Sequence, residues 1–323
     1  MNHCLLCPRR CGAGRNSGSR GFCGETAELR VAAASIHYGE EPPVTGTGGS
    51  GTVFITGCNL GCVFCQNYQI SRQGMGRAVG APEFVEICLV LQARGAENIN
   101  IVTGSHAVPA LAAGIAWARK QGLFIPVLWN SSGYEGEESL ALLKDTVDVY
   151  LPDLKTLDSG LASRFFNAPD YPEYAAAAIL KMIEYRKPGF GPGRGTAGAP
   201  VEVMRSGVMI RHLVIPGCLE ATREVLRWFA GKAQGRALLS LMTQYTPVKT
   251  PGPAGKAVLP VPGRYVSDEE YDTLMEWLEE FGIDDGFCQE PVTGSEWLPD
   301  FNRQNPFSSD LSVPVWHWRE GFV

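Results

Sequence analysis

Residues 52–65 read TVFITGCNLGCVFC, an apolar run that leads directly into a loop with three cysteines. The apolar run at 52–56 has the length and β-branched content of a buried strand. The loop spaces its thiols as Cys58-x3-Cys62-x2-Cys65. Chance seldom places three cysteines in one loop, and thiols this close together can converge on one ion or one cluster.

Three thiols leave a four-iron cluster one protein ligand short. A [4Fe-4S] cluster normally takes four cysteines, so one iron here would keep an open position, as a catalytic zinc does. An open iron can take a small chelate such as the amino and carboxylate groups of S-adenosylmethionine (SAM). An electron from the cluster could then cleave the sulfonium and release an adenosyl radical. The alternatives are a structural zinc ion, for which no fourth His or Cys follows nearby, and three unrelated buried thiols.

From residue 52 onward, apolar runs of strand length alternate with longer helical patterns. Strands are predicted at 52–56, 98–103, 123–129, 147–155, 208–215 and 237–244, and one more is predicted before them at 29–37. Helices are predicted near 82–95, 107–121, 135–145, 170–187, 220–233 and 267–281. This alternation predicts an α/β fold with a parallel sheet, either an open doubly wound sheet or a partial barrel.

Three further stretches lie outside this alternation. Residues 187–199 (KPGFGPGRGTAGA) are so rich in glycine and proline that we predict a solvent-exposed loop, and 246–263 form a second long loop. The tail from about Glu290 carries five large aromatic residues, namely Trp297, Phe301, Phe307, Trp316 and Trp318. Because that much aromatic surface is costly to leave in water, the tail is expected to pack on the body of the protein.

The composition narrows the class of protein. The chain has 323 residues, and its 28 Lys and Arg against 34 Asp and Glu give a formal net charge of -6, which argues against a nucleic-acid partner. No apolar run approaches the ~18 residues of a membrane span. The start, MNHCLLCPRRCG, lacks the apolar core of a signal peptide. We therefore expect a cytoplasmic protein without a membrane partner, whose cysteines bind metal or catalyse rather than form disulfides.

A second group of cysteines opens the chain, with the spacing Cys4-x2-Cys7-x3-Cys11-x11-Cys23. Four thiols are sufficient for a closed site that holds either zinc or an auxiliary iron–sulfur cluster, and the spacing does not separate the two. Redox-active or spare thiols are the alternative. The isolated cysteines at 88, 218 and 288 are most simply small buried hydrophobes.

The Cys58-x3-Cys62-x2-Cys65 run, with an aromatic residue at Phe64, resembles the signature of the radical SAM superfamily. Within it, the chain is similar to the pyruvate formate-lyase activating enzyme-like branch, in an uncharacterised subgroup with an N-terminal cysteine motif. The supporting stretches are CLLCPRRCG (4–12), HYGEEPPVTGTGGSGTVFITGCNLGCVFCQNYQIS (37–71), WNSSGYE (129–135), VDVYLPDLK (147–155), IRHLVIPG (210–217), LMTQYTP (241–247) and WLPDFNRQNPF (297–307).

This resemblance implies a partial (β/α)6 barrel with the cluster and SAM at the carboxyl ends of its strands. The expected organisation is a cysteine-rich metal- or cluster-binding segment at 1–38, the barrel at 39–290 and an aromatic tail at 291–323. The implied cofactors are a [4Fe-4S] cluster on Cys58, Cys62 and Cys65 and SAM, with a second cluster or zinc on the first four cysteines.

Several side chains near strand ends are candidates for binding SAM, and Phe64 joins them through the signature. Asp153 and Lys155 resemble the family's Asp-Leu-Lys motif, whose lysine is implicated in holding the cosubstrate; a simple ion pair is the alternative. Asn130 resembles a position that binds the ribose or amino-acid end of SAM, although a plain turn would also place an asparagine there. Gln244, at the end of the last predicted strand, is a weaker candidate by the same analogy.

Two more candidates lie on other strands. Arg211 has a planar fork that suits the methionyl carboxylate, and strand alternation means that at most one of Arg211 and His212 faces the barrel mouth. The second strand ends in Thr103-Gly104-Ser105-His106, where the activating enzymes carry Gly-Gly-Glu. In this chain, backbone carbonyls, Ser105 or His106 would have to replace that glutamate, unless His106 is instead a substrate-facing acid or base.

The leading hypothesis is an oxidoreductase-type radical SAM enzyme that reductively cleaves SAM to make a 5′-deoxyadenosyl radical for hydrogen abstraction. The resemblance weakly favours a glycyl-radical protein as the target, and another protein or a small molecule stays open. The implied reductant is a protein such as flavodoxin or ferredoxin. The alternatives are an iron–sulfur electron carrier and a metal-stabilised binding protein, neither of which turns over a substrate.

Overall fold

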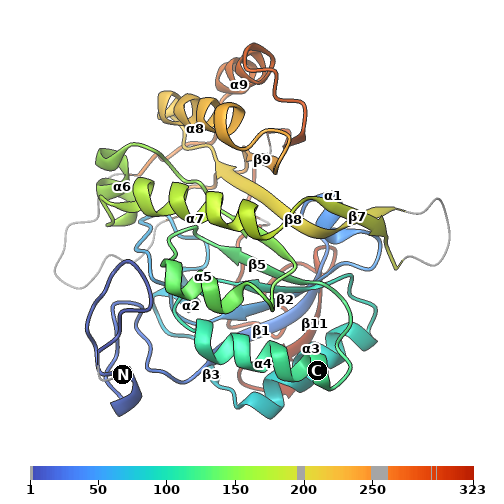
Figure 1. Ribbon diagram of the computed structural model, residues 1–323. Helices are drawn as coiled ribbons and strands as arrows, with labels where there is room; N and C mark the ends of the chain where they lie inside the picture. Colours follow the sequence, from blue (N-terminus) through green and yellow to red (C-terminus); the bar gives the residue numbers. More distant parts are fainter. Residues whose placement is uncertain (1–2, 195–200, 249–260, 292, 296) are drawn as a thin grey trace.

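The computed structural model describes residues 3–194, 201–248, 261–291, 293–295 and 297–323 (Figure 1). Along these ranges, strands and helices alternate much as the apolar pattern predicts. None of the described helices is both long and apolar enough to cross a membrane.

The strands are β1 (Arg30–His37), β2 (Ser50–Ile55), β3 (Arg77–Ala78), β4 (Ile99–Val102), β5 (Val127–Ser131), β6 (Val149–Pro152), β7 (Gly189–Pro192), β8 (Glu202–Leu213), β9 (Leu238–Met242), β10 (Gly286–Cys288), β11 (Ser312–His317) and β12 (Gly321–Phe322). The helices are α1 (Pro42–Thr45), α2 (Tyr68–Ser71), α3 (Ala81–Ala93), α4 (Val108–Lys120), α5 (Glu137–Leu143), α6 (Ser159–Phe166), α7 (Tyr171–Tyr185), α8 (Leu219–Lys232) and α9 (Asp268–Glu280), together with a 3-10 turn, η1 (Arg15–Ser17).

Among the described residues the strands form one sheet in the order β10-β9-β8-β6-β5-β4-β2-β1-β11-β12, with β3 and β7 paired off this path. Neighbours from β2 through β10 are parallel. Strand β1 is antiparallel to β2, and β11 is antiparallel to β1. The predicted α/β fold is confirmed, and this parallel-rich open sheet is consistent with a partial barrel.

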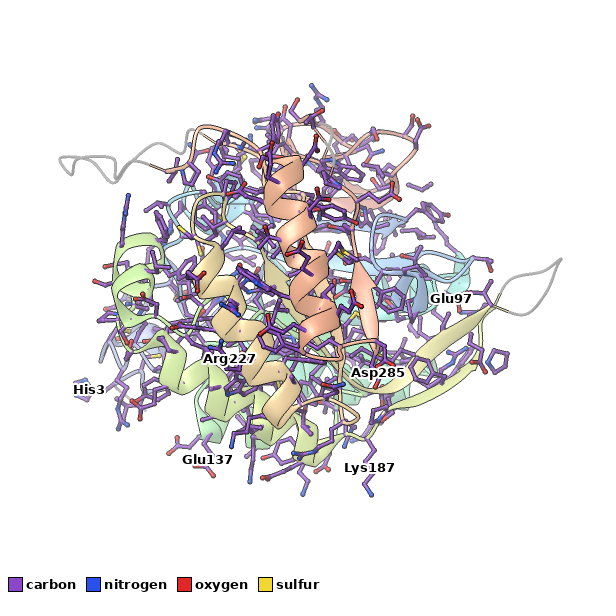
Figure 2. All side chains as sticks on the ribbon, turned by 90° about the horizontal axis from the view of Figure 1, so that it is seen from above. His3, Glu97, Glu137, Lys187, Arg227 and Asp285 are labelled. Atoms are coloured by element: carbon purple, nitrogen blue, oxygen red, sulfur yellow. The ribbon has the colours of Figure 1, made fainter. Side chains whose placement is uncertain are left out.

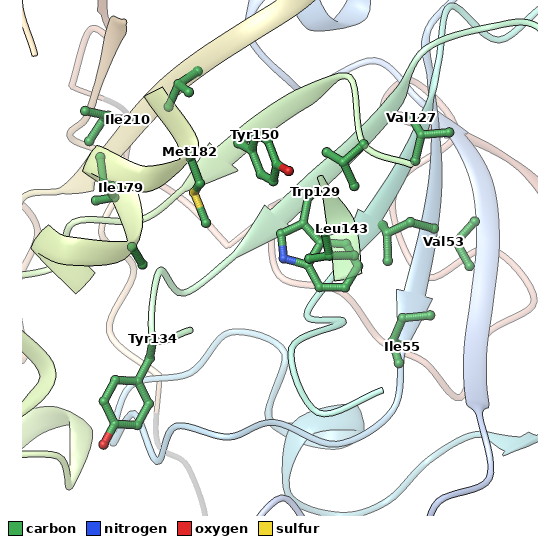
Figure 3. Packing of buried hydrophobic residues seen from close by; sticks show 14 of the residues in the cluster. Val53, Ile55, Val127, Trp129, Tyr134, Leu143, Tyr150, Ile179, Met182 and Ile210 are labelled. Carbon is green, nitrogen blue, oxygen red and sulfur yellow. The ribbon is translucent and has the colours of Figure 1, made fainter. Parts of the chain in front are cut away.

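The core divides according to the two faces of the sheet. On β5, Val127 and Trp129 belong to the large cluster beneath the helices, whereas Leu128 belongs to a small cluster on the other face. Strand β6 repeats this alternation, with Tyr150 beneath the helices and Val149 on the other face. Figure 3 shows the packing around Trp129 and Tyr150. The helices thus bury one face of the sheet and leave the other free to line a central cavity.

The C-terminal tail packs on the body, as the aromatic content predicts. Phe301 and Trp316 are fully buried, and strand β11 extends the sheet beyond β1. The Phe301 ring lies edge-on to Phe54 of β2 with the ring centroids 5.4 Å apart. The sheet is continuous across both predicted domain boundaries, because β1 and β11 lie in it beside the barrel strands. The boundaries themselves stay predictions.

The prediction of a loop over 187–199 is wrong in its first part. Residues Gly189–Pro192 form β7, which pairs antiparallel with the early residues of β8. Strand β8 therefore begins at Glu202, well before the predicted position 208. Strand β7 adds only to the edge of β8, where a proline and two glycines interrupt no central ladder. Residues 195–199, like residues 249–260 of the second predicted loop, lie outside the described residues.

Candidate active site

The loop with the three central cysteines leaves the carboxyl end of β2 and is held by the backbone of α6. Gly61 N donates to Phe166 O at 3.2 Å, and Val63 N donates to Phe165 O at 2.9 Å. On the other side, Gly57 N donates to Ile70 O of α2 at 3.0 Å. These bonds fix the path of the loop at the strand-end edge of the sheet, where ligands of parallel α/β proteins gather.

The three thiols of this loop lie close enough to interact electrostatically. Burial raises the pKa of the Cys62 thiol to about 12, with Lys155 acting in the opposite direction and both Cys58 and Cys65 reinforcing the rise. Burial and the neighbouring Cys65 also raise the pKa of Cys58, which Arg72 opposes. The chemistry of this donor set is that of a cluster site: three partly buried thiols in one loop, with Lys155 and Arg72 near enough to offset thiolate charge.

Phe64 does not project into open space. Its ring is 93% buried and meets Phe165, Phe166 and Tyr245 edge-on, with ring centroids 5.8, 5.8 and 5.5 Å away. This aromatic cluster binds the loop to α6 and to the segment after β9. The described contacts of Phe64 are therefore packing contacts, and its predicted role toward SAM stays a prediction.

A cavity of about 250 Å³ opens on the face of the sheet that the helices leave free. Each parallel strand contributes to its wall at or just beyond its carboxyl half, with Phe54, Val102, Asn130, Asp153, Arg211, Met242 and Gln289. Gln66 and Asn67, which directly follow the last central cysteine, line it too, as does the predicted Gln244. The tail closes the wall with Trp297, Pro299, Phe307 and Leu311.

Arg211 faces this cavity but already has two carboxylate partners. Its Nε donates to Glu41 Oε1 at 2.9 Å, and its terminal Nη2 pairs with Glu40 at 2.5 Å and also with Glu41. Glu40 accepts a further bond from Asn100 Nδ2 at 2.9 Å. His212 points to the opposite face, where its ring nitrogens lie 2.6 Å from Leu154 O and 2.9 Å from Thr222 Oγ1. The predicted bond of Arg211 to a methionyl carboxylate would have to form beside this ion group.

Asp153 and Lys155 form an ion pair at the end of β6, with Nζ and Oδ2 2.5 Å apart. Although burial works against charge on the amine, the Asp153 carboxylate raises the pKa of Lys155. Tyr171 of α7 fixes the turn, since its hydroxyl donates toward Asp153 O at 2.8 Å and accepts from Lys155 N at 3.0 Å. The charged lysine thus lies between the cavity wall and Cys62, where a second anionic group could bind it.

Thr103 and His106 give the end of β4 an unusual geometry. Thr103 has φ +63°, a left-handed value that a β-branched residue rarely adopts and that is typical of functional sites. His106 does not line the strand-end cavity, because its ring is buried against the N-terminal segment with Nε2 2.8 Å from Thr56 O. Burial and the nearby Arg15 lower the pKa of His106 to about 4. This position gives no support to a substrate-facing acid or base.

A carboxylate does lie at the end of β4, although the sequence pattern missed it. Glu135, from the loop after β5, accepts from Ser105 Oγ at 2.6 Å and from Trp129 Nε1 at 3.1 Å. Burial raises its pKa, and its second oxygen has no hydrogen-bond partner among the described residues. The sequence analysis did not identify Glu40, Glu41 or Glu135 as site residues. Each contacts a partner that lies far away along the chain and that only the folded sheet brings near.

The four N-terminal cysteines form a second group of thiols, with Cys4 and Cys11 in side-chain contact. Burial raises the pKa of Cys7 to about 12, and the neighbouring Cys4 and Cys23 reinforce it. Within the described ranges, no three His, Cys, Asp or Glu side chains are placed as ligands of a single metal ion.

Comparison with known proteins agrees with this arrangement. Residues 52–194 match the family model described as the radical SAM superfamily. Over 290 residues, the chain is 28% identical to an uncharacterized protein of Methanocaldococcus jannaschii, covering 88% of this chain and 76% of that protein.

Among solved structures, the fold is similar to that of Streptococcus suis SuiB bound to S-adenosylmethionine, with a TM-score of 0.51 and 13% identity. That match covers 72% of this chain and 48% of SuiB, so the chain spans about half of that protein. A domain of a pyruvate-formate lyase-activating enzyme from Bacteroides vulgatus gives a TM-score of 0.39 at 14% identity, over 57% of this chain and 91% of that domain.

Proposed function

We propose, from the match of residues 52–194 to the radical SAM family model, that the protein cleaves SAM reductively at a [4Fe-4S] cluster held by Cys58, Cys62 and Cys65. When bound, the cluster would supply an electron that breaks a carbon–sulfur bond of SAM, leaving methionine and a 5′-deoxyadenosyl radical able to take a hydrogen atom from the target. A glycyl-radical protein is the class of target that the motif resemblance favours.

The observation that carries the proposal is the placement of three thiols beside one cavity. The loop that bears them continues directly into Gln66 and Asn67 of the cavity wall. A ligand in the cavity would therefore lie next to the loop that bears the three thiols, where an iron without a fourth cysteine would keep an open position. A simple electron carrier has no need for that opening.

The chain's own residues bind and orient the cosubstrate. Lys155, which stays charged beside Asp153, is a donor for a ribose hydroxyl or a carboxylate. Asn130 and Gln244 line the cavity together with Asp153, the partner of Lys155, and offer amide donors and acceptors. The aromatic tail residues Trp297 and Phe307 cover the cavity and exclude water from it.

The test is formation of 5′-deoxyadenosine after anaerobic reconstitution with iron and sulfide and addition of dithionite and SAM. Cys58→Ala is expected to abolish the product and to remove about four irons. Cys88→Ala is the matched control, because Cys88 is a buried residue of α3 and belongs to neither cysteine group. A fully loaded wild-type protein that makes no 5′-deoxyadenosine would contradict the proposal and favour the electron-carrier alternative.

A glycyl-radical target has its own test. Incubation of the active protein with a candidate target is expected to give the paramagnetic doublet of a radical on a glycine α-carbon. Replacing that α-hydrogen with deuterium should transfer deuterium into 5′-deoxyadenosine. Product that stays free of deuterium would exclude that target while leaving SAM cleavage intact.

A further inference from the structure

The cavity extends inward from the strand ends to the ion group of Arg211, Glu40 and Glu41. Glu40 accepts from Asn100 Nδ2 at 2.9 Å, and Asn100 is aligned with Thr52, three residues before the last residue of β2. At about 3.3 Å per residue, the ion group lies about 10 Å deeper than the end of β2 from which the cysteine loop leaves. A substrate group that reaches the ion group would therefore lie beyond SAM, which the proposed function places beside that loop.

This inner end of the cavity carries a negative charge that no cation among the described lining residues balances. Two carboxylates share the single guanidinium of Arg211, and the Lys155 ammonium is already paired with the Asp153 carboxylate. Burial and Arg211 lower the pKa of His37, which also lines the cavity, although Glu40 acts in the opposite direction. The imidazole is therefore neutral at pH 7. A cation that enters the cavity would meet one uncompensated negative charge.

Hydrogen-bond acceptors without donors lie around this charge. Asn100 is fully buried, and because its Nδ2 donates to Glu40, its Oδ1 lies beside that carboxylate, with no partner among the described residues. In the cavity wall, the buried Oε1 of Gln289 also lacks a partner within the described part of the chain. Leaving a buried acceptor unpaired costs free energy, which a ligand with N–H donors would recover.

The surroundings favour an organic cation over a metal ion. Within the described ranges, no three His, Cys, Asp or Glu side chains are placed to hold one metal ion. The cavity is also lined by the apolar side chains of Phe54, Val102, Met242 and Leu311, on which an aliphatic stem would bury its surface. A primary ammonium group is compact and carries three N–H donors, which suits several acceptors in a confined space.

We propose that the substrate presents a primary ammonium group to Glu40 and Glu41, carried on an aliphatic stem that packs against the apolar part of the cavity wall. The proposal rests on the proposed function, because the molecule held in this way is the one that loses a hydrogen atom. The 5′-deoxyadenosyl radical takes one hydrogen atom from a C–H bond of that molecule, which gives 5′-deoxyadenosine and a carbon-centred radical. The ammonium group keeps its proton and its charge in this step.

Binding of matched charged and neutral probes tests the proposal. The protein is reconstituted anaerobically with iron and sulfide and titrated calorimetrically without reductant, once saturated with SAM and once without it. Pentylamine is expected to bind at least about tenfold more tightly than pentanol, because only the ammonium forms charge-assisted hydrogen bonds with the carboxylates. The peptide acetyl-glycyl-lysyl-glycinamide is compared in the same way with its norleucine analogue.

The two pairs of probes distinguish the two sources of a primary ammonium group. A preference for pentylamine alone identifies a small aliphatic amine as the substrate, and a preference for the lysyl peptide identifies a lysine side chain of a protein target. No preference for the charged member of either pair would overturn the proposal. Because the titration needs neither reductant nor SAM cleavage, its failure is distinguishable from the failure of the proposed function.

Glu40→Gln tests where the cation binds. The substitution removes the excess negative charge and leaves Arg211 paired one to one with Glu41, so the fold is expected to be kept. The preference for the charged probe should fall below about twofold, whereas SAM affinity should stay that of the wild type. Glu137→Gln is the matched control, because Figure 2 shows Glu137 at the outer edge of the molecule and Glu137 does not line the cavity.

Two results with Glu40→Gln would overturn the proposal. One is a variant that keeps the full preference for the charged probe. The other is a loss of SAM affinity with the probe preference unchanged, which would show that the ammonium of SAM itself occupies the inner end. Circular dichroism checks the fold of the variant, and if the variant does not fold, the wild-type comparison of charged and neutral probes still decides.

Discussion

At the scale of single residues, the ion group of Arg211, Glu40 and Glu41 shows how burial determines the loss of stability that a substitution causes. Arg211 and Glu41 have side chains only 7% and 8% exposed, and Glu40 is 13% exposed. Two carboxylates share one guanidinium there, so the group carries one excess negative charge. A buried ion group gives little net stability, but removing its only cation leaves both carboxylates unpaired in a poorly solvated site.

We therefore expect Arg211→Met to lower the free energy of unfolding by about 3–5 kcal/mol at pH 7. The variant Arg211→Met/Glu40→Gln/Glu41→Gln should recover most of that loss, because it removes the unpaired charges as well. Urea denaturation of the three proteins measures both effects. A triple variant no more stable than Arg211→Met would show that the loss is one of packing.

The same group predicts a pH dependence. Burial tends to raise the pKa of Glu41, but Arg211 outweighs it and holds this pKa below its ordinary value. A lowered pKa means that Glu41 contributes stability above its unfolded-state pKa and loses it as the pH falls through the folded-state value. In Arg211→Met only the hydrogen bonds from Ser240 and from the Glu41 backbone still oppose the effect of burial, and acid relieves the unpaired charge. The stability difference between wild type and Arg211→Met should therefore shrink as the pH falls from 7 toward about 4.

Lys155 gives a prediction about binding rather than stability. If its ammonium holds SAM, Lys155→Ala should weaken SAM binding by about 10- to 100-fold, the value of one charge-assisted hydrogen bond. Calorimetric titration of the reconstituted protein measures the affinity, and the iron content should stay that of the wild type. Lys181→Ala, on the exposed face of α7, is the control. Unchanged affinity in Lys155→Ala would show that the lysine pairs with Asp153 but does not bind SAM.

Individual site residues also differ in whether they could be predicted from the sequence. Cys58, Cys62 and Cys65 could be found from spacing alone, because all three lie in one loop. Strand alternation correctly separated the faces of Arg211 and His212. The glutamate partners of Arg211 could not be found, since they lie 170 and 171 positions away along the chain. Glu135 lies in a turn whose sequence gives no sign of burial.

At the scale of elements, helix α6 links local sequence to the cluster loop. Its N-cap, Asp158, accepts from Leu161 N at 2.9 Å, and its last residues hold the loop through their carbonyls. Asp158→Ala is expected to cost about 0.5–2 kcal/mol of stability, and Asp158→Asn should cost much less because the amide oxygen still caps the helix. Thermal unfolding of both variants measures this. Equal losses would mean that the charge of Asp158, rather than its cap bond, matters.

Elements with a full apolar pattern were predictable, and those without one were not. The helix predicted near 82–95 is observed at Ala81–Ala93, and the strand predicted at 237–244 is observed at Leu238–Met242. Helix α6 is short, and its local signs are its two caps, Asp158 at the start and Asn167 in the left-handed conformation at the end. Strand β7 has no apolar pattern at all, because its pairing with β8 rather than its composition makes it a strand.

At the scale of the whole molecule, the tail joins the far end of the chain to the active site. Phe301 packs on Phe54, its N–H donates to Gln69 Oε1 at 2.7 Å, and its carbonyl accepts from Trp318 Nε1 at 3.0 Å. Gln69 belongs to α2, which follows the cysteine loop directly. The aromatic content predicted that the tail packs, but only the fold shows that it forms part of the cavity wall.

The tail is therefore expected to contribute measurably to the free energy of unfolding of the whole protein. Phe301→Ala should lower the free energy of unfolding by about 3–5 kcal/mol, as expected for a fully buried aromatic ring whose removal leaves a void. Phe322→Ala is the matched control, because that ring is 38% exposed on the edge strand β12 and should cost well under half as much. Urea denaturation followed by far-ultraviolet circular dichroism measures both. A cost below about 1 kcal/mol for Phe301→Ala would mean that the tail rests on the barrel without stabilising it. In that event Phe307 and Trp297 could no longer be regarded as a fixed wall of the cavity.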